Sequence, residues 1–177
     1  MTISISPVIS HPRVVVTGHD EAGTSLFSSD LEVPLFCPFG PAASSFAVFD
    51  VRSAVPVNNV DPAQEHANII PRCPPSGVLF CLSNIPPNFT VPMHRTLSLD
   101  YAIVMSGQIV IKVDNGDEKT VKAGEFIIQA GANHQWINKT DETCRIAFVM
   151  VGAEKIKVAD GTELEGTAPS LKKRYEM

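Results

Sequence analysis

Two histidines and one carboxylate are the residues in this sequence best suited to chemistry. His94 and Asp100 stand six residues apart in PMHRTLSLDYAIVMSG, and His134 stands in GANHQWIN. An imidazole exchanges a proton near neutral pH, and beside a carboxylate it can act as a general base. Two imidazoles and a carboxylate can also bind Fe(II), Zn(II), Mn(II) or Ni(II) and leave coordination positions open. His94, Asp100 and His134 are therefore candidate catalytic residues and candidate metal ligands, and both kinds of site remain open.

The spacing of nearby residues predicts which side chains share a face with these three. Alternate residues of an extended strand point the same way, so Thr96 and Asp100 should lie on the face of His94. By the same rule Trp136 and Asn138 should lie on the face of His134. If the two segments line opposite walls of a small barrel, all these side chains meet at its mouth, where small molecules commonly bind. Thr96, Trp136 and Asn138 are then substrate-pocket residues. The alternatives are a hydrogen-bonded, partly buried role for each histidine taken singly and a core role for Trp136.

The elements that must position these residues show a period of two. Apolar and β-branched runs separated by turn signals predict an antiparallel sandwich or barrel. Asn115-Gly116 is a strong hairpin signal between two of the runs. The predicted strands are 13–17, 46–51, 78–82, 101–106, 108–113, 119–122, 126–129, 134–137 and 144–151.

The chain also divides by composition. Prolines recur before residue 76 and interrupt regular pairing. We interpret residues 1–75 as an N-terminal extension that adds strands and loops, 76–152 as the barrel core and 153–177 as a tail. Residues 170–176 could form a short helix in that tail.

The spaced motifs resemble those of the cupin family. His94, Thr96, Asp100 and Gly107 follow the order of the first cupin motif, and Gly124, Gly131, His134 and Asn138 follow the second. Thr96 stands in place of the second histidine, Asp100 in place of a glutamate, Gln129 in place of a proline and Asn88 in place of a glycine. The resemblance covers residues 76–152. It implies a double-stranded β-helix, or jelly-roll barrel, and a homodimer.

Length, charge and composition restrict the kinds of partner that the chain can have. The 177 residues suffice for one domain, and a net charge of −5 argues against nucleic acid or an anionic membrane as partner. The N-terminus lacks the pattern of a secretory signal, no stretch is long and apolar enough to span a membrane, and the four cysteines form no CxxC pair. We therefore expect a cytoplasmic protein whose partner is a small-molecule substrate.

Three functions remain to be weighed. The first is an enzyme of secondary metabolism, a lyase or isomerase that uses acid–base chemistry on a small oxygenated substrate. Dehydration, decarboxylation or cyclisation of a polyketide-like compound would fit the resemblance. The second is a metal-dependent dioxygenase, and the third is a non-catalytic ligand-binding protein. For the acid–base enzyme, a bound divalent metal (Zn, Fe, Mn or Ni) and a metal-free site are both left as alternatives.

Overall fold

The computed structural model describes residues 10–61 and 68–167, and the regular elements there are all β-strands. The bounds of the strands are β1 (Arg13–His19), β2 (Ser25–Glu32), β3 (Ser45–Arg52), β4 (Val78–Ile85), β5 (Thr90–Arg95), β6 (Ser98–Ser106), β7 (Gln108–Val113), β8 (Glu118–Lys122), β9 (Phe126–Ala130), β10 (Asn133–Ile137) and β11 (Cys144–Gly152). Within this described part no helix is long and apolar enough to cross a membrane.

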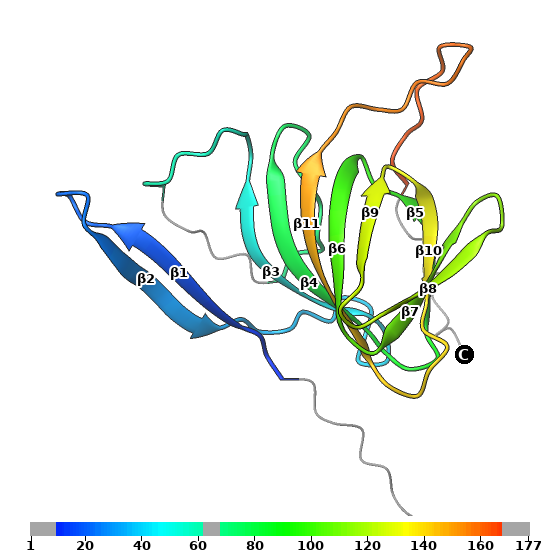
Figure 1. Cartoon of the computed structure of the whole chain (residues 1–177), viewed down its shortest axis with the longest axis horizontal. Coiled ribbons are helices and arrows are strands. Elements are labelled where there is room, and N and C mark those ends of the chain that lie inside the picture. The colour runs from blue at the N-terminus through cyan, green and yellow to red at the C-terminus, as the bar shows by residue number, and fades with distance from the viewer. Residues whose placement is uncertain (1–9, 62–67, 168–177) are drawn as a thin grey trace, which may run out of the picture.

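Two antiparallel sheets form the barrel (Figure 1). One has four strands in the order β5-β10-β7-β8, and the other has five in the order β3-β4-β11-β6-β9. β4 pairs with β3, and from β5 onward every strand except β8 lies in a different sheet from the strand before it; such alternation between two sheets is typical of a jelly roll. The prediction of an all-β barrel is confirmed.

The barrel interior is built by alternation along the strands. In β6, Asp100, Ala102 and Val104 are buried, whereas Tyr101 and Ile103 between them are exposed. The same rule applied to both sheets gives one main apolar cluster of buried residues: Ile85, Ala102, Val104, Ile109, Val121, Trp136, Cys144 and Ile146. Trp136 of this cluster lies on the same strand as His134, so the candidate site adjoins the packed core.

Each predicted strand coincides with an observed one, and two strands were not predicted. β2 is rich in serine and carries acidic residues, so it has little apolar signal. β5 holds His94 and ends at Arg95, and β6 starts at Ser98 in the other sheet. His94 and Asp100 therefore do not lie on one continuous strand. The helix considered for residues 170–176 falls outside the described residues.

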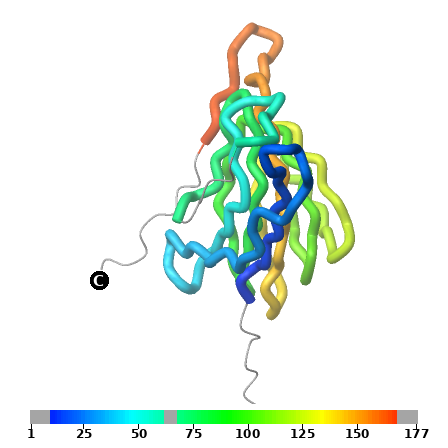
Figure 2. The backbone as a smooth tube through the Cα atoms, turned by 90° about the vertical axis from the view of Figure 1, so that its left-hand side faces the viewer, coloured from blue at the N-terminus to red at the C-terminus, as the bar shows by residue number. Residues whose placement is uncertain are grey.

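The N-terminal region contributes unequally to the barrel. β3 joins the five-stranded sheet beside β4. β1 and β2 instead pair with each other and form a hairpin that projects beyond β3 (Figures 1 and 2). The base of the hairpin is held by Arg145 of β11, whose guanidinium donates a 2.7 Å hydrogen bond to the Ser10 carbonyl.

Candidate functional site

His94 and His134 are direct neighbours across two paired strands. β5 and β10 are antiparallel, and His94 is the register partner of His134. Residues paired in this way point to the same side of a sheet. The two imidazole rings lie 4.2 Å apart, centroid to centroid, at an interplanar angle of 52°. The structure therefore brings the two predicted histidines together, but on one wall of the barrel and not on opposite walls as expected.

Backbone carbonyls fix the tautomer of both rings. Nδ1 of His94 lies 2.8 Å from the Pro92 carbonyl oxygen, and Nδ1 of His134 lies 2.9 Å from that of Ala132. A carbonyl can only accept a hydrogen bond, so each Nδ1 carries the proton and donates it. In the neutral rings, both Nε2 atoms then keep a free lone pair. Each can take up a proton.

The surroundings keep this pair neutral at physiological pH. Burial lowers the pKa of His94, and the positive charge of Arg72 lowers it further, against the hydrogen bond to Pro92. Burial together with the neighbouring His94 lowers the pKa of His134 to about 4. Two imidazolium ions this close would also repel each other. His94, which is the more accessible of the two, is therefore the ring that accepts the first proton.

Trp136 joins the histidine pair to the core. Its ring meets that of His134 edge to face at 5.2 Å and that of Phe148 at 5.9 Å. The indole is 5% exposed and belongs to the main apolar cluster. Trp136 is therefore a core residue whose ring packs against His134.

Asp100 lies on the other sheet and has its own set of partners. Ser98 donates a 2.5 Å hydrogen bond to Oδ1, and Thr96 and Gln129 donate to Oδ2 at 3.3 and 3.4 Å. Burial raises the pKa of Asp100, and the Ser98 and Thr96 hydroxyls oppose that rise. Among the described residues no hydrogen bond or ion pair joins Asp100 to His94 or His134.

The donor set does not fit the three-ligand metal site considered from the sequence. The histidine pair has one property of metal ligands, since each Nδ1–H is held by a carbonyl and each Nε2 is left unprotonated. In the part of the chain that the structure describes, however, no three His, Cys, Asp or Glu side chains are arranged to hold a metal ion. The Asp100 carboxyl group instead accepts hydrogen bonds from three neutral side chains.

Arg72 and Cys73 lie in a proline-rich loop that borders the site. The sequence did not predict a role for either residue. The charge of Arg72 acts on His94. The Cys73 thiol donates to the Met150 carbonyl at 3.2 Å, and burial and Asp100 raise its pKa to about 11. Cys81 on β4 behaves alike, with a pKa of about 12. Both thiols are therefore protonated at neutral pH and are poor nucleophiles.

The two remaining predicted pocket residues differ in what they can offer a substrate. The Asn138 side chain donates to the carbonyls of Ile85 and Glu142 and accepts from the amide and hydroxyl of Thr140. These four bonds use its full capacity, so it fixes the turn after β10. Thr96 donates to Asp100, and its oxygen can still accept a hydrogen bond.

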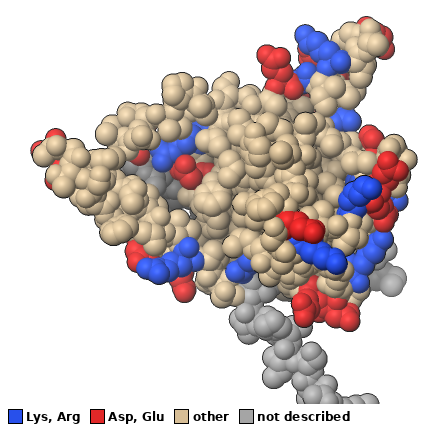
Figure 3. Space-filling view, in the orientation of Figure 1, with Lys and Arg blue, Asp and Glu red and all other residues tan. Residues whose placement is uncertain are grey.

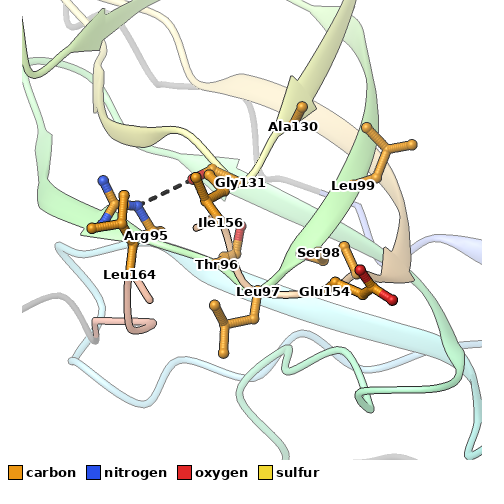
Figure 4. A pocket seen from close by; sticks show the side chains of 11 residues that line it. Arg95, Thr96, Leu97, Ser98, Leu99, Ala130, Gly131, Glu154, Ile156 and Leu164 are labelled. Carbon is orange, nitrogen blue, oxygen red and sulfur yellow. Dashed lines mark hydrogen bonds between the residues drawn. The ribbon is translucent and has the colours of Figure 1, made fainter. Parts of the chain in front are cut away.

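A pocket of about 280 Å³ opens at the rim of the barrel beside this threonine (Figure 4). Its wall is mainly apolar and is formed by Arg95, Thr96, Leu97, Ser98, Leu99, Ala130, Gly131, Ala153, Glu154, Ile156 and Leu164. Neither His94 nor His134 lines it. Thr96 and Ser98 line this wall, and their hydroxyls also donate hydrogen bonds to Asp100. These hydroxyls therefore link the carboxyl group to the pocket.

Comparison with known proteins agrees with the fold and with the motif spacing. Residues 81–152 match the model of the cupin domain family called Cupin_2. The cupin domain of Cnp3 from Schizosaccharomyces pombe has a similar structure, with a TM-score of 0.50 at 12% identity over 79% of this chain and 87% of that one. The chain thus carries a cupin domain, built as the double-stranded β-helix that its motifs predicted.

Relatives of similar length include fungal proteins named for a biosynthesis cluster and fungal proteins named oxidoreductases. Phomopsin biosynthesis cluster protein C′ of Diaporthe leptostromiformis is 29% identical over 91% of this chain and 88% of its own length. The cupin-domain-containing oxidoreductase fogC of Aspergillus ruber is 29% identical over 96% of this chain and 87% of its own length.

Proposed function

We propose that this cupin is an enzyme of secondary metabolism that transfers a proton on a small oxygenated substrate. Loss of water or carbon dioxide, isomerisation or cyclisation are the reactions that such a step would serve. The observation that carries the proposal is the pair of neutral imidazoles whose Nδ1 protons are fixed on carbonyls. The relatives named as phomopsin biosynthesis cluster proteins support the assignment to secondary metabolism.

In this proposal His94 acts as the base. Its Nε2 removes a proton from carbon or oxygen of the substrate, while the Nδ1 hydrogen bond to Pro92 keeps the ring in place. Burial and Arg72 disfavour the resulting imidazolium, so His94 returns the proton readily to the leaving group or to another atom of the substrate. The His134 ring packs against the His94 ring, stays neutral and helps to keep His94 in its orientation.

Asp100 takes part through Thr96 in the same proposal. The carboxyl group accepts a hydrogen bond from the Thr96 hydroxyl. The lone pairs of the threonine oxygen are then directed toward other donors. A hydroxyl of the substrate can donate to this oxygen and be oriented beside the barrel mouth. The choice among substrates would then rest on Thr96 and on the apolar wall of the rim pocket.

A redox reaction is the second candidate function, and the names of relatives favour it. FogC is named an oxidoreductase, as are two relatives from Neurospora crassa. A redox-active metal would be the usual agent for a dioxygenase. Elemental analysis of the purified protein, before and after incubation with iron, copper, nickel or zinc salts, separates this function from metal-free proton transfer.

The test of the proposal is a comparison of metabolite conversion by matched variants. Purified wild-type protein, His94→Gln and His134→Gln would be incubated in D2O with small-molecule extracts of a fungal culture, with and without oxygen, and products followed by mass spectrometry. His11→Gln, which changes an exposed histidine, is the control. We expect wild type and His11→Gln to release water or carbon dioxide from one compound or to exchange its hydrogen for deuterium. His94→Gln should lower that rate by about 100-fold or more.

Other outcomes are equally informative. A product that gains oxygen atoms, or that forms only under air, would contradict the acid–base proposal and support the redox function. Conversion by His94→Gln at the wild-type rate would remove His94 as the base.

A further inference from the structure

The rim pocket is bounded on one side by the chain that follows β11. This chain leaves the barrel at Ala153, whose amide donates a 3.3 Å hydrogen bond to the Leu97 carbonyl. It returns at Thr167, whose amide donates a 2.9 Å hydrogen bond to the Arg95 carbonyl. We call residues 153–167 the arm. Both ends of the arm are therefore tied to the short link between β5 and β6.

Apolar side chains from the arm and from the barrel line the pocket together. The arm packs close to the turn between β9 and β10, since a Cβ at Gly131 would lie 3.2 Å from Cδ1 of Ile156. At about 30 Å³ for each water-sized group, the volume of about 280 Å³ holds roughly nine or ten non-hydrogen atoms. The pocket therefore suits a small ligand with an apolar body. The large apolar side chains around it are Leu97, Leu99, Ile156 and Leu164.

Arg95 places a cation at the edge of this apolar pocket (Figure 4). Its Nε donates a 3.2 Å hydrogen bond to the Gly131 carbonyl, which holds the guanidinium against the turn between β9 and β10. The side chain is only 17% exposed, so it has lost most of its hydration. A charge in such surroundings interacts more strongly with an opposite charge than it would in water.

The terminal nitrogens of Arg95 have little to bind within the chain. Among the described residues they make no hydrogen bond, and their ion pair with Asp114 spans 3.8 Å. The Asp114 side chain is 59% exposed, and an exposed ion pair of that length contributes little stabilisation. The edge formed by the two terminal nitrogens can therefore bind a carboxylate through two parallel hydrogen bonds.

Glu154 gives the pocket a direction. It lines the same pocket, is exposed, and lies at the opposite end from Arg95 in Figure 4. An anionic group is attracted to the Arg95 end and repelled from the Glu154 end. The two charges therefore favour a ligand whose single negative charge lies beside Arg95.

The lysines of the arm already have partners of opposite charge. Lys155 pairs with Glu163 and Glu165, and Lys157 pairs with Glu163. Figure 3 shows charges of both signs side by side on this arm, which projects at the upper right. Of the described residues that line the pocket, Arg95 is the only basic one. It is therefore the group that a ligand anion would meet there.

We propose that the rim pocket binds a carboxylic acid with a small apolar body and that Arg95 holds its carboxylate. The inference rests on the proposed function in one respect, since it makes such an acid the substrate class of that site. Thr96 belongs to the same wall, so a hydroxyl on the apolar body can donate to it while the carboxylate stays on Arg95. Binding itself does not require His94, which does not line the pocket.

The first test measures binding without turnover. Titration calorimetry would compare octanoate, whose ten non-hydrogen atoms match the pocket, with octanol and octylammonium. Octanoate should bind wild type with a dissociation constant of about 0.1–1 mM, and the other two at least about 10-fold more weakly. Arg95→Gln should weaken octanoate by about 10-fold or more, because charge-assisted hydrogen bonds are lost. Lys119→Gln, which removes the same charge from an exposed position of β8, should bind as wild type does.

Further variants separate charge, hydrogen-bond geometry and the apolar wall. Asp114→Asn removes the competing carboxylate and should tighten octanoate binding by about twofold. Arg95→Lys keeps the charge without the planar pair of donors, so its affinity should lie between those of wild type and Arg95→Gln. Leu164→Asn makes the wall polar and should weaken octanoate by about 5-fold or more.

His94→Gln keeps this proposal distinct from the proposed base. It should bind octanoate as wild type does, so a failure of the base in the conversion assay would leave the binding result unchanged. Wild type that binds no octanoate at about 10 mM would overturn the proposal. Binding that Arg95→Gln and Arg95→Lys both leave unchanged, or equal binding of octanoate and octylammonium, would overturn it as well. Circular dichroism of each variant separates lost binding from lost folding.

Discussion

At the scale of single residues, the decisive contacts are the hydrogen bonds from each Nδ1 to a backbone carbonyl. They leave Nε2 as the titrating atom of both His94 and His134. We predict that nitrogen NMR of the imidazoles at pH 7 shows both rings neutral with the proton on Nδ1. On acidification His94 should titrate below its ordinary pKa of 6.5, and His134 only near pH 4. A ring with its proton on Nε2 at pH 7 would contradict the tautomer on which the proposed base depends.

Arg72 offers a second prediction at this scale. Its charge lowers the pKa of His94, so Arg72→Gln should raise that pKa. The midpoint of the His94 titration should move to higher pH, and the acid limb of any pH–rate profile should move with it. Arg145→Gln, which alters an arginine that bonds Ser10 and Asn84, is a suitable control and should leave the midpoint unchanged.

The residues of the site show where sequence reasoning succeeds. The motif spacing predicted that His94 and His134 meet, and they do so as register partners on one wall of the barrel and not across it. Asp100 was placed on the face of His94 by counting residues through Thr96 and Leu97. The chain passes from one sheet to the other at that point, so the count no longer tells direction. Arg72 comes from a proline-rich loop, whose path has no periodicity that a sequence could reveal.

At the scale of elements, the turn between β6 and β7 explains why a motif position holds glycine. Gly107 has a φ of 73°, and a Cβ there would lie 3.0 Å from the Thr143 carbonyl oxygen. Asn88, which stands where the first motif begins with glycine, also has a positive φ, of 53°. Asparagine tolerates this conformation better than most residues do, so the backbone of the motif is kept without its glycine.

Two alanine substitutions should separate backbone conformation from close packing. Gly124 has a φ of 85° with open space around it, so Gly124→Ala should cost about 1–2 kcal/mol from conformation alone. Gly107→Ala adds a collision with backbone and should cost about 1–3 kcal/mol more. Urea unfolding of both variants provides the measurement. Equal losses would show that the contact with Thr143 adjusts without cost.

At the scale of the whole molecule, the buried histidine couples the fold to pH. His134 has a folded pKa of about 4, against 6.5 for an ordinary histidine. The unfolded chain therefore binds a proton more readily, and stability that is complete above pH 6.5 is lost as the pH falls to 4. The loss from this residue should be about 3 kcal/mol.

The matching measurement is the free energy of unfolding of wild type and of His134→Gln between pH 7 and pH 4. The difference between the two proteins should shrink as the pH falls, since glutamine does not titrate. Asp100 has a raised folded pKa and acts in the opposite sense, but it is present in both proteins and cancels in the difference. A difference that stays constant with pH would show that His134 keeps its ordinary pKa.

The whole fold was more predictable than its surface. Alternating apolar residues specify a barrel because burying one face of each strand is the main source of stability. The same alternation leaves Phe126 and Ile128 on the outside of β9, where nothing in a single sequence says which face meets solvent. The position of β2 was equally hidden, since its serine-rich stretch has no apolar period.

The turn held by Asn138 has a consequence for how the protein can be produced. Asn138-Lys139-Thr140 is an acceptor sequence for N-linked glycans. The folded turn buries the Asn138 amide and engages its nitrogen with two carbonyls, so a sugar attached during translocation would prevent the turn from closing. Secretion from a yeast host should therefore yield misfolded, glycosylated chains, whereas expression in bacteria should not meet this obstacle.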